Sequence, residues 1–524
     1  MANGLGGSNP SLTVAGKKPN LTHIFDTMNE IVNLADNSAV YDVAQVSPLS
    51  LAVQLSKRVS NQVYLKREDE QVIHSFKLRG AYQKISSLSD AQKRKGVIAS
   101  SAGNHAQGVA LAANRLKIKA LIIMPISTPK IKVQAVQQLG AEVILHGDVY
   151  DEAFDHARLL ESEKGLTFIS PYDDFDVIAG QATIAKEILS QLKEIDLIFI
   201  PVGGGGLISG MASYIKHHSP HIKVIGVEPL ETPTLFRSLK ENKRVILDDV
   251  GRFAEGVAVK QIGELPFEIA KDTVDDVVLV SNDEMCAAIK DIYEDVRSIS
   301  EPAGALATAG VKKYIANNGL KDKNIVSVVS GSNVNFDRLR YVAERADIGE
   351  RNEAILAVTI PEEPGSLLKF CELIGDHSVT EFNYRYLGKK AAHIFVGIQL
   401  SNGESEKQTL INKLRKSFEV IDMSDNSIAK THIRYMVGGR TNAENEVIYH
   451  FEFPERPGAL LNFLKKMKTK WNISLFHYRN HGADFGRVLI GLQVDDVSEL
   501  ETRFDGLGYP YKNETNNKAY QYFL

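Results

Sequence analysis

The last third of the chain repeats itself, and this repeat constrains the fold more than any other feature of the sequence. Residues 360–368 read IPEEPGSLL and residues 453–461 read FPERPGALL, which places Gly458 at an offset of 93 from Gly365. Two further pairs of segments, VTEFNYR with ISLFHYR and IFVGIQL with VLIGLQV, match at an offset of 94. Three matched blocks in the same order indicate two copies of one small domain.

Each copy is predicted to run strand, Pro-Gly turn, helix, strand, strand, helix, which is the element order of a ferredoxin-like α+β unit. We place the copies at residues 354–428 and 447–524, behind a charge-dense connecting helix at 341–353. A duplicated module of this kind is either purely structural or a sensor. We favour a sensor, because two copies can form a symmetric ligand site where they meet.

The first two thirds of the chain follow a different pattern, and we place one α/β domain at residues 23–340. Short apolar runs rich in β-branched residues alternate there with helical stretches, which predicts buried parallel strands joined by crossover helices. The predicted strands are 97–99, 120–124, 142–145, 197–202, 224–227, 277–280 and 325–329, and the helices between them include 105–115, 130–139, 151–163 and 180–192. Ligands are expected in loops at the carboxyl ends of these strands.

Composition and net charge favour a small molecule as the partner of this chain. The 61 basic and 65 acidic residues give a net charge of -4 without a long basic run, so nothing draws the chain to nucleic acid or an anionic membrane. Two cysteines exclude a disulfide framework and a cysteine-rich metal site, and they fit the reducing cytoplasm. Residues 1–22 are predicted to be a flexible tail, because the first 20 are rich in Gly, Asn, Ser and Lys. They lack the apolar core of a signal peptide.

The uncharged stretch 197–215 is long enough to suggest a membrane span. Pro201 and the four glycines after it would break such a helix, so a buried strand followed by a glycine loop is the better prediction.

Lys77 lies in the segment SFKLRGA, which follows an apolar strand at 63–66. An aldehyde cofactor needs an amine that is unprotonated part of the time. At the start of a helix, partly desolvated beside Phe76 and near Arg79, the ammonium form of Lys77 would be disfavoured. Taken alone, a lysine in such a segment is usually an ordinary solvated helix residue.

The second segment, SSAGNHAQG at 100–108, opens a helix directly after a strand. Its small residues Ser101, Ala102 and Gly103 expose backbone N–H groups that favour an anion such as a substrate carboxylate. Asn104 can also donate a hydrogen bond to a phenolate oxygen. A simple helix cap is the alternative, and His105 by itself suggests a structural residue.

The third segment consists of four successive glycines, Gly203, Gly204, Gly205 and Gly206, followed by Leu207. Such glycines let backbone N–H groups converge on a phosphate, and a linker rarely lies between a buried strand and a helix. The spacing is neither that of a P-loop nor that of a dinucleotide fold, which favours a phosphorylated cofactor over a nucleotide. In the fourth segment, SGSN, Ser330 supplies a neutral hydroxyl at a strand end, which alone indicates only a turn.

Together these segments, in this order and at these separations, resemble the tryptophan-synthase-like (fold type II) group of pyridoxal-phosphate enzymes. FAEGVAVK at 253–260, EPAGA at 301–305 and the doubled C-terminal unit make the chain similar to biosynthetic threonine dehydratases (threonine ammonia-lyases), which carry two ACT-like regulatory domains. The resemblance spans nearly the whole chain from about residue 23.

The resemblance implies that pyridoxal 5'-phosphate is the cofactor and that Lys77, flanked by Phe76, binds it covalently. Asn104 would bond the 3-oxygen of the ring, the loop 203–207 would hold the phosphate, and Ser330 would face the ring nitrogen. The substrate carboxylate would be held by the segment from Ser101 to His105. Related serine racemases commonly carry a proton-donating serine at the position of Ala102, so the alanine argues against racemisation.

The implied reaction is the deamination of L-threonine, and of L-serine, with 2-oxobutanoate and ammonia as the products from threonine. Lys77 would remove the α-proton as general base. A serine opposite the ring nitrogen cannot keep that nitrogen protonated, which favours prompt loss of the β-hydroxyl. The step would be the first committed one of isoleucine biosynthesis.

The family resemblance further implies inhibition by isoleucine, opposition by valine, and a homotetramer. Pockets are expected near the turns at 364–367 and 457–460 and near the strands that contain Phe382 and Phe476.

Three alternatives stay open at this point: a serine dehydratase, a threonine synthase, or an amino-acid-binding regulator whose catalytic domain is inactive. Glu255 and Glu301 are polar enough to suggest a cation site, but a structural role explains them equally well. We therefore predict no metal ligand.

Overall fold

In the computed structural model the chain forms two compact units, Met1–Ala346 and Asp347–Leu524. The described residues are 21–251, 253–336, 338–349, 352–363, 365–386, 391–426, 429–430, 433–436, 438, 441, 443–454, 459–467, 471–479 and 485–517. The predicted tail therefore lies almost entirely outside the described residues, and so do Pro364 and Pro457 of the two Pro-Gly turns.

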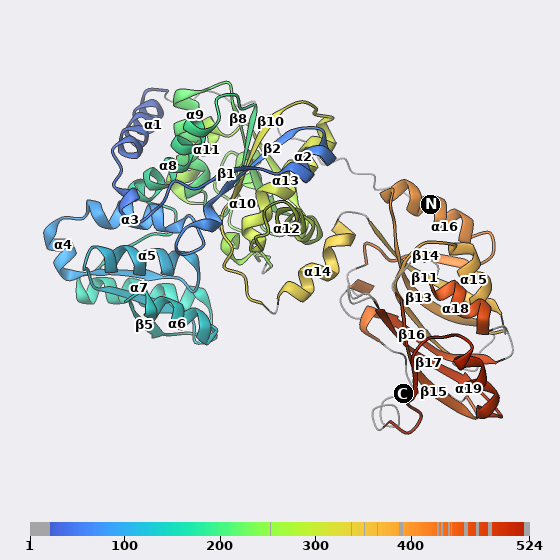
Figure 1. The fold of residues 1–524 in the computed structure, drawn as a ribbon. Coiled ribbons are helices and arrows are strands. Elements are labelled where there is room, and N and C mark those ends of the chain that lie inside the picture. Colours follow the sequence, from blue (N-terminus) through green and yellow to red (C-terminus); the bar gives the residue numbers. More distant parts are fainter. Residues whose placement is uncertain are drawn as a thin grey trace. The chain divides into compact units, whose positions relative to one another are not determined.

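The first unit contains two largely parallel sheets (Figure 1). The larger sheet has the order β1 (Leu49–Leu51), β2 (Gln62–Arg67), β10 (Asn324–Val329), β7 (Leu197–Pro201), β8 (Lys223–Pro229) and β9 (Asp276–Val280). Its pairs are parallel except for β1 with β2. The smaller sheet is parallel, in the order β5 (Glu142–Leu145), β4 (Ala120–Met124), β3 (Val97–Ser100) and β6 (Thr167–Phe168).

All seven predicted strands are present, but one was wrongly predicted to be buried. Strand β5 exposes both of its end residues and half-buries the two between them. It pairs with β4 alone, so as an edge strand it is not packed between neighbours.

The helices of the first unit cover the faces of both sheets. Their bounds are α1 (Leu21–Asp36), α2 (Val53–Val59), α3 (Lys77–Ser87), α4 (Asp90–Lys95), α5 (Asn104–Arg115), α6 (Lys130–Gln138), α7 (Tyr150–Lys164), α8 (Phe175–Gln191), α9 (Gly206–His218), α10 (Thr234–Glu241), α11 (Glu264–Thr273), α12 (Asn282–Val296) and α13 (Pro302–Asn318). Helices α5, α6 and α7 lie on the smaller sheet. Helix α8 begins five residues before its predicted start, because the Asp174 carboxylate caps it by accepting a hydrogen bond from Val177 N.

Successive residues of β7 enter different cores, as the pleat of a strand requires. Ile198 and Ile200 pack with α1, α8, α9 and α11, whereas Leu197 and Phe199 pack with α2, α12 and α13. The uncharged stretch 197–215 is thus a buried strand and the helix after it. Within the described residues, no helix combines the length and apolarity needed to span a bilayer.

The second unit contains the predicted repeat, with one short strand added to each copy. The first copy comprises β11 (Glu353–Pro361), α15 (Ser366–Ile374), β12 (Val379–Arg385), β13 (Ala391–Gln399), α16 (Gly403–Leu414) and β14 (Glu419–Asp422). The second comprises β15 (Glu446–Pro454), α18 (Ala459–Met467), β16 (Asn472–Arg479), β17 (Phe485–Gln493), α19 (Val497–Asp505) and β18 (Tyr511–Asn513). The predicted connecting helix is α14 (Arg338–Gly349), which ends earlier than expected, since Glu353 already begins β11.

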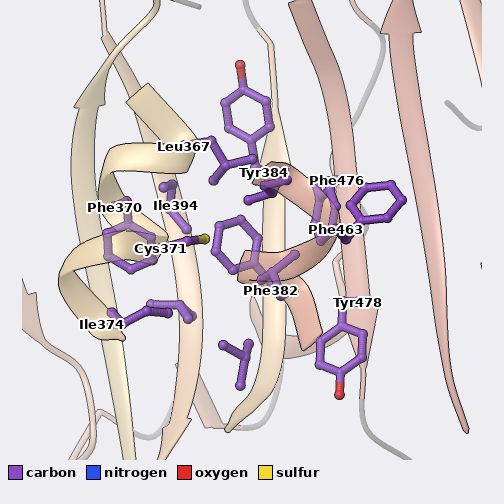
Figure 2. Packing of buried hydrophobic residues seen from close by; sticks show 14 of the residues in the cluster. Leu367, Phe370, Cys371, Ile374, Phe382, Tyr384, Ile394, Phe463, Phe476 and Tyr478 are labelled. Carbon is purple, nitrogen blue, oxygen red and sulfur yellow. The ribbon is translucent and has the colours of Figure 1, made fainter. Parts of the chain in front are cut away.

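The two copies share one antiparallel sheet, in the order β14-β11-β13-β12-β16-β17-β15-β18. They join where β12 pairs with β16, and Asn383 lies opposite its own repeat equivalent His477. Beside this pair, the rings of Phe382 and Phe476 meet edge to face with centroids 5.4 Å apart (Figure 2). Buried residues of both copies form one continuous hydrophobic core.

Candidate active site

Lys77 is the first residue of α3, and its Nζ donates a hydrogen bond to the carbonyl oxygen of Pro171 at 2.9 Å. The ring of Phe76 lies under the amine, 5.3 Å from Nζ to the ring centroid. Loss of solvation lowers the Lys77 pKa to about 8, against the opposing effect of the Glu301 carboxylate. About a tenth of the amine is therefore free at pH 7, far more than in a solvated lysine.

Arg79 does not produce this shift, contrary to expectation. Its guanidinium is fully buried and pairs with Glu68 at 2.8 Å and with Glu187 at 2.6 Å. Glu187 also accepts from the buried Lys66 amine at 2.6 Å. This ionic network ties α3 to β2 and α8, so Arg79 anchors the helix that carries Lys77.

Helix α5 approaches the lysine segment closely, backbone against backbone. A Cβ added to Gly108 would lie 3.0 Å from the carbonyl carbon of Lys77, so a larger residue would push the two helices apart. His105 is buried, and its Nε2 lies 2.8 Å from the carbonyl oxygen of Ile169. Burial and the nearby Lys77 lower the His105 pKa to about 3, so the ring is neutral and serves the fold.

The residues before α5 form an open turn. Ser101 Oγ accepts a hydrogen bond from Gly103 N at 3.2 Å, and a Cβ added to Gly103 would meet no atom within 4 Å. The start of the helix thus faces free space, as a bound carboxylate would require. The neighbouring Asn104 side chain donates from Nδ2 to Glu301 Oε1 at 2.7 Å and accepts at Oδ1 from Asn333 Nδ2 at 2.7 Å.

The glycine loop follows β7 and opens α9, with Gly205 at a φ of +92°. A Cβ added to Gly204 would lie 2.2 Å from the Tyr172 ring, and one added to Gly203 would lie 2.9 Å from Val257 Cα. Only backbone fits there, so the N–H groups of the loop and the helix start are available to a phosphate. The Lys77 amine bonds to Pro171 and the glycine loop packs against Tyr172. The two features therefore contact adjacent residues of the chain.

Ser330 follows β10 and lies beside the lysine segment. Its carbonyl oxygen accepts from Phe76 N at 3.2 Å, and its Oγ donates to the carbonyl oxygen of Ala303 at 3.3 Å. The next residue, Gly331, forms a β-bridge with Ser75. The structure therefore joins the SGSN, SFKLRGA and SSAGNHAQG segments directly, and it joins the glycine loop to them through residues 171 and 172.

Sequence reasoning missed the residues that connect these segments. Tyr172 carried no signal, Asn333 stood in the SGSN segment without an assigned role, and Glu301 was considered only for a cation site or a structural role. Glu255 pairs instead with Lys132 at 2.9 Å and with Arg338. In the part of the chain that the structure describes, no group of three or more His, Cys, Asp or Glu side chains is arranged to hold a metal ion.

The residues present fit pyridoxal phosphate. A desolvated amine, a loop with room for backbone only, and a neutral hydroxyl beside the lysine segment match its aldehyde, phosphate and ring nitrogen.

Comparisons with known proteins agree with this geometry. Residues 41–331 match the pyridoxal-phosphate-dependent enzyme family, and residues 344–433 and 437–524 each match the C-terminal regulatory domain of threonine dehydratase. The chain is 54% identical to the biosynthetic L-threonine dehydratase IlvA of Pasteurella multocida, over 96% of this chain and 99% of that protein. It is 52% identical to the protein of the same description from Escherichia coli, over 93% and 95%.

A solved structure shows the same similarity. The processed form of threonine deaminase isoform 2 from Solanum lycopersicum matches with a TM-score of 0.62 and 47% identity, covering 64% of this chain and 97% of that chain.

Proposed function

The chain belongs to the threonine dehydratase family of pyridoxal-phosphate-dependent enzymes, and from that premise we propose that it deaminates L-threonine to 2-oxobutanoate and ammonia. L-serine is a second substrate of the same site. The observation that carries the proposal is the desolvated amine of Lys77, held between Phe76 and the Pro171–Tyr172 segment. For this activity we assign residues 23–340 to catalysis and residues 354–428 and 447–524 to regulation.

Lys77, Phe76, Asn104, Ser330 and the loop 203–207 would hold the cofactor. When bound, pyridoxal phosphate withdraws electrons from the α-carbon of the amino acid and so makes its proton acidic. The Lys77 amine accepts that proton as general base. The neutral Ser330 hydroxyl would not hold the ring nitrogen protonated as a carboxylate would, which favours early loss of the β-hydroxyl.

The open turn before α5 would bind the substrate carboxylate through hydroxyl and backbone N–H groups of the segment from Ser101 to His105. The Ser101 N–H is not among them, because it donates to the carbonyl oxygen of Ile123 at 3.2 Å. Ala102 has no hydroxyl with which to return a proton to the other face of the α-carbon. Elimination is therefore favoured over racemisation.

The second unit would bind isoleucine as inhibitor, in a pocket formed by both copies. The first copy contributes the turn at Glu362 and Ser366 together with Tyr384, and the second contributes Leu464 and Met467. The Tyr384 hydroxyl donates to the Glu362 carboxylate, which can pair with an ammonium group, while the apolar side chains suit an aliphatic chain. Valine would oppose isoleucine by preferring the other of two global states.

We place this activity in the cytoplasm, in a homotetramer that catalyses the first committed step of isoleucine biosynthesis. The two cysteines, Cys286 and Cys371, are buried and unpaired, which supports a reducing compartment. Light scattering of the purified protein measures the oligomeric state, and a monomer would contradict that part of the proposal.

The test of the catalytic assignment compares Lys77→Ala with the exposed control Lys240→Ala. After hydride reduction, peptide mass mapping of the wild type should locate the cofactor on Lys77. Keto-acid release from threonine should fall by roughly 10³-fold in Lys77→Ala and stay unchanged in Lys240→Ala. Turnover retained by Lys77→Ala, or phosphate release from phosphohomoserine by the wild type, would contradict the proposal.

A further inference from the structure

Glu301 occupies the residue position before α13 but does not cap that helix. Acidic side chains near a helix start commonly accept hydrogen bonds from its free N–H groups. The Glu301 side chain makes no such bond, and Oε1 accepts from Asn104 Nδ2 at 2.7 Å instead. The carboxyl is therefore turned toward a residue that is 197 positions away in sequence and opens α5.

Neighbouring amides determine which atom of Asn104 faces which partner. Asn333 Nδ2 donates to the carbonyl oxygen of Ile73 at 2.8 Å and to Asn104 Oδ1 at 2.7 Å, so both of its hydrogens are used. Asn104 must then turn its oxygen to Asn333 and its nitrogen to Glu301. One hydrogen on Asn104 Nδ2 goes to the carboxyl, and a second remains for a ligand.

The space that the carboxyl occupies is provided by glycines. A Cβ on Gly331 would lie 2.8 Å from Glu301 Oε1, and a Cβ on Gly304 would lie 2.1 Å from the Gly331 carbonyl oxygen. The backbone N–H of Glu301 donates to that same oxygen at 3.1 Å. The start of α13 and the SGSN segment thus pack closely enough to hold the carboxyl in one position.

Several charged groups surround the carboxyl. Lys132 of α6 and Lys77 of α3 favour its charged form, as does the hydrogen bond from Asn104, whereas Glu255 disfavours it. Burial outweighs the favourable contacts and raises the Glu301 pKa to about 7. The acceptor oxygen is thus available near neutral pH without a full negative charge beside the ligand.

We propose that Glu301 is a positioning residue of the active site, which fixes the Asn104 amide so that its second Nδ2 hydrogen is presented to the bound cofactor. The inference rests on the proposed function, in which Asn104 binds the cofactor ring. The carboxyl itself reaches the reaction only through Asn104.

The test uses full-length protein and separates the acceptor atom from the charge. Glu301→Gln keeps an acceptor oxygen at Oε1, whereas Glu301→Leu removes it at similar volume. Apoprotein is titrated with pyridoxal phosphate and followed by the visible absorption band. We expect Glu301→Leu to bind the cofactor about tenfold more weakly with a shifted band, and Glu301→Gln to stay within about twofold of the wild type.

Two further variants guard against a merely structural effect. Glu264→Leu replaces an exposed acid at the start of α11 and should leave both cofactor affinity and the band unchanged. Asn333→Ala frees the other side of the Asn104 amide, so its effect and that of Glu301→Leu should be less than additive. Thermal unfolding of each holoprotein separates lost stability from lost affinity.

The outcomes distinguish this inference from the function it rests on. If Glu301→Leu binds cofactor as tightly as the wild type with the same band, while the wild type deaminates threonine, the positioning role is wrong and the function stands. If the wild type binds cofactor but releases no keto acid, the function is wrong, and the titration still decides the role of Glu301.

Discussion

The amine of Lys77 donates a hydrogen bond to the carbonyl oxygen of Pro171, 2.9 Å away. The next residue, Tyr172, lies against the glycine loop, where its ring leaves no room for a side chain on Gly204. The group that would bond the cofactor aldehyde and the loop that would hold its phosphate are therefore linked through two adjacent residues.

The rate of cofactor uptake by apoprotein should depend on pH through Lys77. Since burial lowers the Lys77 pKa to about 8, the free amine increases nearly tenfold per unit below pH 8 and levels off above it. We expect the rate constant for reconstitution, measured by absorbance with excess pyridoxal phosphate, to follow this curve. A rate that keeps rising toward about pH 10.4, the value of a solvated lysine, would contradict the assignment.

Alanine at two glycines of the site should have different effects. In Gly204→Ala the new methyl group meets the Tyr172 ring, and we expect a loss of about 2 kcal/mol of unfolding free energy together with weaker cofactor binding. In Gly103→Ala the methyl group enters open space, so stability should change by less than about 0.5 kcal/mol while the KM for threonine rises. Urea unfolding measures the change in stability of each variant, and steady-state kinetics measure the KM. Equal destabilisation by the two variants would contradict the prediction that only Gly204 lacks room for a methyl group.

The buried ionic network behind Lys77 should make stability sensitive to Glu187. Glu187→Gln leaves Arg79 and Lys66 without a shared counter-charge, which we expect to cost about 3 kcal/mol of unfolding free energy at pH 7. Glu268→Gln, which removes a half-exposed partner of Lys271, is the control and should cost less than about 0.5 kcal/mol.

The same carboxylate should contribute to acid sensitivity. Burial alone would raise the Glu187 pKa, but Arg79 and Lys66 lower it below its ordinary value. The stability it contributes is therefore present above the unfolded value of about 4.3 and is lost as pH falls through the lower folded value. The stability gap between wild type and Glu187→Gln should narrow in that acid range, and a gap that does not depend on pH would contradict this account.

Inhibition by isoleucine should depend on Glu362. If its carboxylate pairs with the ligand ammonium, Glu362→Gln should raise the concentration for half-inhibition about tenfold and leave uninhibited activity unchanged. Glu372→Gln, on the exposed face of α15 and outside the pocket, is the matched control. The same half-inhibitory isoleucine concentration for both variants would show that Glu362 does not bind the inhibitor.

Periodicity and repetition were sufficient to predict an α/β domain followed by two copies of a small α+β domain. Alternating apolar runs indicated parallel strands, and the 93- to 94-residue offset indicated the duplication, whereas the type II fold and the regulatory role came from the family resemblance. The edge position of β5 was not predictable, since an apolar run does not show how many neighbours its strand will have.

The same distinction applies to the candidate site. Lys77, Asn104, the glycine loop and Ser330 were predicted from four local segments and their joint resemblance to a known family, because each segment taken alone also allowed a structural role. The roles of Tyr172, Asn333 and Glu301 depend on side chains that meet across long stretches of sequence, such as the 197 residues between Asn104 and Glu301. Only the packing of α13 against the SGSN segment decides that the Glu301 carboxyl faces the Asn104 amide rather than its own helix.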